Sequence, residues 1–120
     1  MTEKFLLYDN GPEEGERMLI FGRESWISLL CCEEWFVDGT FKISPLMFMQ
    51  VFAINVKHFG RIFPVIYALL PNKRGTTYME FFTRVKNLNP AIKPNCISCG
   101  YEVGIHNAVR EVFEDVEMRG

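Results

Sequence analysis

Three apolar runs follow one another in the middle of the chain, and they limit its fold more than any other feature. They cover residues 35–42, 48–57 and 61–70, and each has the length and composition of a strand. The link between the second and third runs, residues 58–60, contains Gly60 and favours an antiparallel hairpin. Because the runs are apolar on both faces, they predict central strands covered by helices.

The hydrophobic period changes from strand-like to helical after these runs. Thr77 to Glu80 forms a capping-box pattern, whose hydroxyl and carboxylate would satisfy free amides at a helix start. Large side chains at steps of three and four residues predict one buried helical face: Tyr78, Phe81, Phe82, Val85 and Leu88. A short strand at 96–99 and a second helix at about 101–113 are predicted to follow.

The order of these elements predicts the fold class. Three strands, a helix, a strand and a helix are typical of an α/β domain, and the strand-helix-strand link favours a parallel crossover. We expect a mixed sheet of three antiparallel strands plus a parallel fourth, with no closing strand after the last helix. Residues 1–34 are predicted to form an N-terminal ribbon and a short helix at 24–30 that lead into a core at 35–120.

Composition and charge exclude several classes of protein. With 120 residues, 48% of them hydrophobic, the chain is expected to form one globular domain rather than a disordered segment. Its formal net charge of -2 gives no general attraction to nucleic acid, so DNA binding would need a local patch. Since no apolar run has the length of a membrane helix and no signal peptide is found, we expect a soluble, intracellular protein without a membrane partner.

The four cysteines raise the question of a zinc site or a redox pair. Cys96-x-x-Cys99 has a suitable spacing, but residues three apart on a strand point to opposite faces. The adjacent Cys31 and Cys32 also diverge. Small buried free thiols are the simpler interpretation.

The basic residues and the histidines form few patterns that are typical of a binding or metal site. Four cations lie near strand ends or in loops, where they would contact phosphate or simply aid solubility: Lys57, Arg61, Lys73 and Arg74. His58 and His106 have no cysteine or acidic partner at metal-ligand spacing, so we expect surface or structural histidines.

Asp38 stands inside the apolar segment WFVDGTFKISP, residues 35–45. A carboxylate in that setting is costly unless it is paired, hydrogen-bonded or bound to a metal. Two interpretations stay open on the residues alone. Asp38 is either a turn carboxylate that accepts hydrogen bonds from nearby amides or a residue of a functional site.

Several blocks of the sequence resemble the transposase core of Mutator-like elements (MULE). They are DGTFKISPLMFMQVFAI, FPVIYALLPNKRGTTYMEFF and YEVGIHNAV, with RMLIFGRESWISLL upstream, and the resemblance covers residues 5–113. It implies a ribonuclease-H-like fold and a DDE site, in which three carboxylates hold two divalent metals for DNA-strand cleavage. In that fold the first strand and the parallel fourth strand are neighbours, so acids on both face the same metals.

The resemblance also assigns the site residues. Asp38 matches the first acid and is the one metal ligand of the family that is present. Gly100 stands where the second acid is expected, and Glu102 matches the glutamate that follows, for which we expect a structural role. The third acid lies beyond Gly120 in the family pattern. We therefore expect a degenerate, C-terminally truncated copy with a truncated ribonuclease-H-like fold.

These assignments predict a transposase-derived domain that is catalytically inactive. It would act in the nucleus if the family's role is kept, and would bind DNA, another protein or a second copy of itself. No cofactor is expected, although an active form would need Mg²⁺ or Mn²⁺. Truncation would leave an open edge on the fourth strand and an open apolar sheet face, which favours self-association or marginal stability.

Two alternatives stay open. An active metal-dependent transposase or nuclease would take its missing ligands from Glu102, Asp115 or another chain. A cysteine-based zinc or redox module would keep its chemistry without Asp38.

Overall fold

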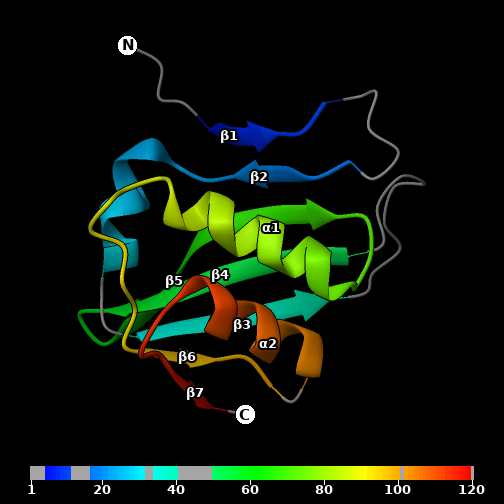
Figure 1. Ribbon diagram of the computed structural model, residues 1–120. Coiled ribbons are helices and arrows are strands. Elements are labelled where there is room, and N and C mark those ends of the chain that lie inside the picture. Colours follow the sequence, from blue (N-terminus) through cyan, green and yellow to red (C-terminus); the bar gives the residue numbers. More distant parts are fainter. Residues whose placement is uncertain (1–4, 12–16, 32–33, 41–49, 101, 120) are drawn as a thin grey trace.

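The computed structural model describes residues 5–11, 17–31, 34–40, 50–100 and 102–119 (Figure 1). Its centre is a seven-stranded mixed sheet in the order β1-β2-β5-β4-β3-β6-β7. The strands are β1 (Leu6–Asp9), β2 (Leu19–Phe21), β3 (Glu34–Thr40), β4 (Gln50–His58), β5 (Arg61–Leu70), β6 (Cys96–Ser98) and β7 (Glu117–Arg119). The expected strand ends at residues 41, 42, 48 and 49, together with Cys32 and Tyr101, lie outside the described residues.

The three central strands form the predicted antiparallel unit. β3 pairs with β4, and β4 pairs with β5 up to the last pair, His58 with Arg61. The turn between β4 and β5 holds Phe59 and Gly60 at positive φ, 50° and 74°. Glycine adopts such angles without a side-chain clash, which permits the tight link. The hairpin predicted from residues 58–60 is therefore confirmed.

On the other side of β3 the sheet is parallel. β6 pairs in parallel with β3, as predicted, and β7 pairs in parallel with β6. The backbone N–H of Glu117 donates to the Asn95 carbonyl at 2.7 Å, and that of Cys99 donates to the Arg119 carbonyl at 3.0 Å. The prediction of a sheet without a closing strand is thus wrong, and so is the predicted open edge on β6. Because β7 is three residues long and Met118 is its one apolar residue, its sequence carries no strand pattern.

The N-terminal ribbon extends the same sheet at its other end. β1 and β2 are antiparallel, and β2 pairs with β5. Asp9 and Arg17 close the ribbon through two hydrogen bonds of 3.1 and 2.8 Å. The Arg17 guanidinium, helped by the Gly11 amide, lowers the pKa of the Asp9 carboxyl. The sheet therefore has seven strands rather than the expected four, while the division of the chain at residue 34 stays a prediction.

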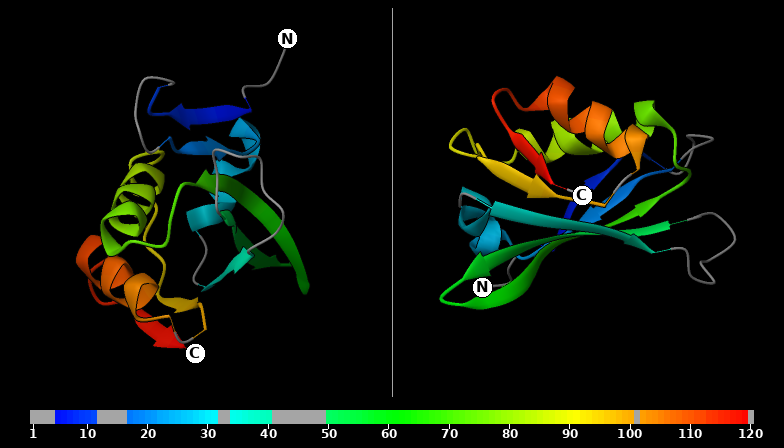
Figure 2. Two further views of the ribbon diagram at one scale, coloured as in Figure 1. Left: turned by 90° about the vertical axis from the view of Figure 1, so that its right-hand side faces the viewer. Right: turned by 90° about the horizontal axis from the view of Figure 1, so that it is seen from below.

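Two helices, α1 (Gly75–Lys86) and α2 (Val103–Val112), lie together on one face of the sheet (Figure 2). The capping box predicted at Thr77 is wrong, because α1 begins at Gly75 and Arg74, three residues before Thr77, occupies the N-cap position. The Thr77 hydroxyl instead donates to the Asn72 side chain at 2.6 Å. Among the described residues, no helix has the length and apolarity to cross a bilayer.

The core lies between the sheet and these helices. Its largest buried side chains include Trp35, Phe52, Tyr78, Phe81 and Phe82. The rings of Trp35 and of Phe113, which follows α2, make a T-shaped contact with centroids 5.2 Å apart. The Trp35 indole N–H also donates to the Leu30 carbonyl of a 3-10 helix, η1 (Glu24–Cys31), at 3.0 Å. This bond fastens η1 to β3, so the segment before the core is tied to the core itself.

The opposite face of the sheet is less covered. Along β4, buried residues alternate with half-buried ones, because successive side chains of a strand point to opposite faces. The far face includes half-buried Val51, Ala53 and Leu69, and Tyr67, which is 42% exposed. The prediction that helices cover both faces is therefore wrong for the described residues, which leave an apolar face partly open.

Candidate functional site

Asp38 and Gly100 lie toward the carboxyl ends of two neighbouring parallel strands, β3 and β6. Phe36 of β3 is paired with Ser98 of β6, and each chain runs two residues further to reach Asp38 and Gly100. Asp38 still lies within β3, whereas Gly100 follows the end of β6 in a turn with a φ of +63°. Both positions therefore come after the last paired residues, toward the carboxyl ends of two neighbouring parallel strands. The structure thus brings together the positions that the resemblance assigns to the first two acids, and Asp38 alone carries a carboxylate.

Asp38 points away from α1 and α2. Its neighbour Val37 is buried, and a Cβ built on Gly39 would meet the side chains of Gln50 and Phe52 on the helical side. Because side chains alternate along a strand, Asp38 faces the open side of the sheet, where it is exposed. Its carboxylate makes no hydrogen bond or ion pair with another described residue, so the turn-carboxylate interpretation gains no support there.

Gly100 has a backbone that suits glycine. Its φ is +63°, in the left-handed region, and no heavy atom lies within 4 Å of a Cβ built on it. The ring of His106, on α2, donates from Nε2 to the Gly100 carbonyl at 2.5 Å. His106 is thus a structural histidine that holds the turn between β6 and α2. An acid at residue 100 would have space but would be strained.

Glu102 is engaged on the helical side of the sheet. It occupies the N-cap position of α2, and its carboxylate accepts a hydrogen bond from the Tyr78 hydroxyl at 3.1 Å. Tyr78 in turn accepts one from the Gln50 amide at 3.2 Å. Burial, reinforced by the Glu102 charge, raises the pKa of Tyr78 to about 12 against the opposing Gln50 hydrogen bond. The Glu102 carboxylate is hydrogen-bonded on the helical side of the sheet, whereas Asp38 faces the open side. The two carboxylates therefore do not converge.

The residues present do not fit a two-metal site. No group of three or more His, Cys, Asp or Glu side chains that could hold a metal occurs in the described part of the chain. Asp115 lies in the turn that leads into β7, which starts opposite Cys96 at the beginning of β6. It therefore lies toward the amino ends of the parallel strands, whereas Asp38 lies toward the carboxyl end of β3. Asp38 remains a single hard oxygen ligand, and Mg²⁺ is usually held by more than that.

The thiols of Cys96 and Cys99 are poor candidates for metal or redox chemistry. Cys96 and Cys99 are buried and free, and Cys31 is free and exposed. Burial raises the pKa of Cys99 to about 11, with a further rise from the Glu102 charge, and burial raises the pKa of Cys96 as well. A raised pKa keeps a thiol protonated at neutral pH, whereas the thiolate is the metal ligand and the nucleophile.

The four predicted phosphate contacts do not form one patch. Lys57 and Arg61 flank the hairpin between β4 and β5, whereas Lys73 and Arg74 follow the other end of β5. β5 is ten residues long, so the two pairs are about 30 Å apart. His58 lies beside the first pair, half-buried at the end of β4.

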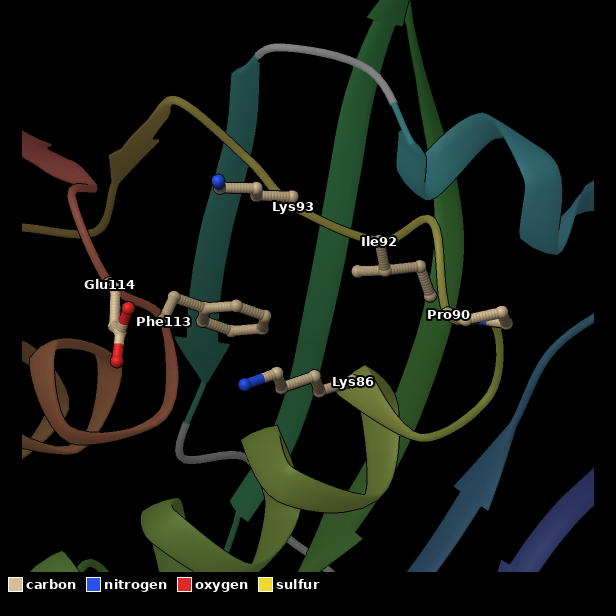
Figure 3. Close-up of a pocket in the computed structure, with 6 residues that line it drawn as sticks. All are labelled: Lys86, Pro90, Ile92, Lys93, Phe113 and Glu114. Atoms are coloured by element: carbon tan, nitrogen blue, oxygen red, sulfur yellow. The ribbon is translucent and has the colours of Figure 1, made fainter.

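A hollow of about 270 Å³ lies beyond the carboxyl ends of α1 and α2 (Figure 3). Its lining includes Lys86, Lys93, Phe113 and Glu114. The Lys86 ammonium donates to the Val112 carbonyl at 3.0 Å, which satisfies a free acceptor at the end of α2. This hydrogen bond gives Lys86 a structural role at the end of α2.

The polar chain from Gln50 through Tyr78 to Glu102 was not predicted as a unit. Tyr78 was expected only as an apolar contact of the helix, and Gln50 had no assigned role. A signal was nevertheless present, because both residues lie within the sequence blocks that resemble the family. A strand pattern alone cannot show that a buried glutamine, 1% exposed, will meet a tyrosine from a helix.

A protein-family model matches most of the chain. The family model described as "MULE transposase domain" matches residues 34–120. The matched segment includes β3 to β7, both α-helices and the positions of Asp38, Gly100 and Glu102. No curated protein sequence matches the chain.

Proposed function

Because the chain belongs to the family of MULE transposase domains, and its function is thus transposase-derived, we propose that it does not cleave DNA with its own residues. In this proposal it keeps a ribonuclease-H-like core and acts through binding. Three antiparallel strands followed by helix-linked parallel strands, with β3 beside β6, support that fold. A DNA-related role would place such a domain in the nucleus.

One observation carries the proposal: glycine stands beside Asp38 where the family pattern expects a second carboxylate. Gly100 follows the end of β6, the parallel neighbour of the strand that holds Asp38, and bears no side chain. Glu102, the nearest acid along the chain, is held by Tyr78 on the helical side. Two metals that activate a water and stabilise a leaving oxygen need several converging carboxylates. Asp38 alone does not supply them.

The open position of Asp38 supports a second candidate function. Its carboxylate is exposed and makes no bond with another described residue, so a metal held largely by other ligands would have access to it. An active transposase or nuclease whose further acids come from another chain would use Asp38 in this way. The cysteine-based alternative is not favoured, since the raised pKa of Cys99 disfavours its thiolate.

Titration calorimetry of Mn²⁺ into the purified chain separates the two candidates. We expect no saturable heat for the wild-type chain, and none for Asp38→Asn. Glu102→Gln is the matched control, because it removes the same charge on the helical side. Saturable binding that Asp38→Asn abolishes and Glu102→Gln preserves would overturn the non-cleaving role and justify cleavage assays.

A further inference from the structure

The tip of the β4–β5 hairpin holds an aromatic ring in solvent. Phe59 is 90% exposed, and its φ of +50° is unusual for a bulky residue. Its ring contacts that of His58, with centroids 4.2 Å apart. Phe59 belongs to neither the core nor the side chains packed against it. Ile62, on the same hairpin, is 58% exposed, so the hairpin presents two large apolar side chains to solvent, and a group of exposed apolar side chains is typical of an interaction site.

A hollow of about 290 Å³ lies beside this tip, between the hairpin and η1. Among the described residues its lining includes Ser25, Trp26, Ser28, Leu29, His58 and Phe63. The indole and phenyl rings offer flat apolar surfaces, while the serines and the histidine bring polar groups to the same space. A flat ring with polar edges, such as a nucleobase, fits this combination better than an aliphatic chain does.

The charges around the hollow are mainly positive. Lys57 and Arg61 flank the hairpin tip, and the Arg23 guanidinium lies over the Trp26 ring, 4.9 Å from its centroid. Glu24 is the one acid within residues 23–29 and 57–63, and Glu34, which precedes the Trp35↔Val56 pair, forms an ion pair with Arg119 at 3.2 Å. This excess of cations contrasts with the net charge of -2 of the whole chain. Exposed rings next to cations are the usual means of binding single strands, whose bases stack while their phosphates meet Lys and Arg.

We propose that this hairpin surface, formed by the β4–β5 tip and η1, binds single-stranded nucleic acid. Bases stack on Phe59 and on the part of the half-buried Trp26 ring that lines the hollow, and phosphates contact Lys57 and Arg61. The surface lies at the end of the sheet away from Asp38, because the register runs from Asp38↔Ala53 through Trp35↔Val56 toward the hairpin. The inference rests on the binding role proposed above and gives it a partner, and it uses none of the carboxylates.

Fluorescence anisotropy with a labelled oligothymidylate, in EDTA and at several salt concentrations, tests the surface. A duplex of the same length is the comparison, and the single strand should bind more tightly, because stacking on exposed rings needs unpaired bases. Trp26 provides a second readout. The chain has two tryptophans, and Trp35 is fully buried, so quenching on addition of the oligonucleotide reports stacking at Trp26.

Two variants at the tip have matched controls elsewhere. Phe59→Ala should weaken binding by at least about fivefold, the range for loss of one stacked base, without changing the salt dependence. Arg61→Gln should weaken binding. It should also reduce the slope of the logarithm of the binding constant against the logarithm of the salt concentration by about 0.7, the value for one lost phosphate contact. Val103→Ala, 68% exposed on α2, and Arg110→Gln, exposed on α2, should leave affinity within twofold.

Three results would overturn the assignment: no oligonucleotide binding, binding without tryptophan quenching, or equal effects of the tip and control variants. The first would point to a protein partner at the same rings. None of them bears on the metal titration, because the oligonucleotide is tested in EDTA. Failure of this surface and failure of the non-cleaving role are therefore distinguishable.

Discussion

The Tyr78 hydroxyl donates to the Glu102 carboxylate at 3.1 Å and thereby joins the first turns of α1 to the start of α2. The same hydroxyl accepts from Gln50 of β4, which is 1% exposed.

Tyr78→Phe would leave this buried amide without its acceptor. We expect the free energy of unfolding to fall by about 1–3 kcal/mol, measured by urea denaturation. Tyr67→Phe, at an exposed tyrosine, should change it by less than about 0.5 kcal/mol, and equal effects of the two variants would contradict the account.

The raised pKa of Tyr78 predicts a loss of stability in alkali. Its ordinary value is 10.0 and its folded value about 12, so the unfolded chain ionises first. The contribution of the protonated Tyr78 hydroxyl to the free energy of unfolding is complete below pH 10 and is lost as the pH rises toward 12. Cys99, raised from 9.0 to about 11, titrates in an overlapping range in both proteins. The wild-type chain should therefore lose stability more steeply than Tyr78→Phe over this interval, and identical slopes would argue against a buried phenol.

Gly39 is required by close packing rather than by its backbone angles. A Cβ at this position would meet the Gln50 side chain and would come within 2.9 Å of Cδ1 of Phe52. Gly39→Ala should lower stability by about 1–3 kcal/mol, as overpacking of a core does. Gly75→Ala is the matched control, because nothing lies within 4 Å of its Cβ and alanine favours a helix. Thermal unfolding should separate the two, and a tolerated Gly39→Ala would refute the packing argument.

The central hairpin, both α-helices and the parallel β6 could be predicted because their signals are local. Apolar runs, the glycine turn at Gly60 and the helical period around Phe81 and Phe82 reflect the backbone geometry directly. β7 could not be predicted, because the partner strand, not a pattern in Glu117–Arg119, determines its pairing. The start of α1 was misplaced because the Asn72 side chain, which accepts the Arg74 amide, competes with the Thr77 capping box.

The positions of the site residues along the strands could also be predicted from the sequence. The sequence blocks place Asp38 on one strand and Gly100 after another, and the parallel pairing of these strands puts both positions toward the same edge of the sheet. What the blocks cannot give is the side of the sheet that each acid faces. That depends on the alternation along β3 and on the bond from Tyr78, which holds Glu102 on the helical side.

The partly open face of the sheet predicts self-association. Tyr67 is 42% exposed there, and the neighbouring strand positions, Ala53 and Phe21, are apolar and half-buried. Sedimentation velocity should show a coefficient that rises with concentration for the wild-type chain and stays constant for Tyr67→Glu. Met79→Glu, at a side chain 40% exposed on α1, adds the same charge elsewhere and should behave like the wild type. A wild-type chain that is monomeric at every concentration would contradict this prediction.

Gly100→Asp should fold in spite of its backbone strain. The left-handed φ of +63° costs about 1–2 kcal/mol for a residue with a Cβ. Aspartate is among the residues that tolerate this region best, and the space around the Cβ is open. Urea denaturation should give a cooperative transition with a stability reduced by that amount. A larger loss would mean that residue 100 needs glycine for folding.

Mn²⁺ titration into Gly100→Asp tests the central claim most directly, because this one change restores the carboxylate that the family pattern expects beside Asp38. We predict no saturable binding to the wild-type chain, measurable binding to Gly100→Asp, and its loss when Asp38→Asn is added. Two results would contradict the claim that the chain folds but lacks a metal site because residue 100 is not an acid. One is saturable Mn²⁺ binding to the wild-type chain that requires Asp38, and the other is a folded Gly100→Asp variant that binds no Mn²⁺.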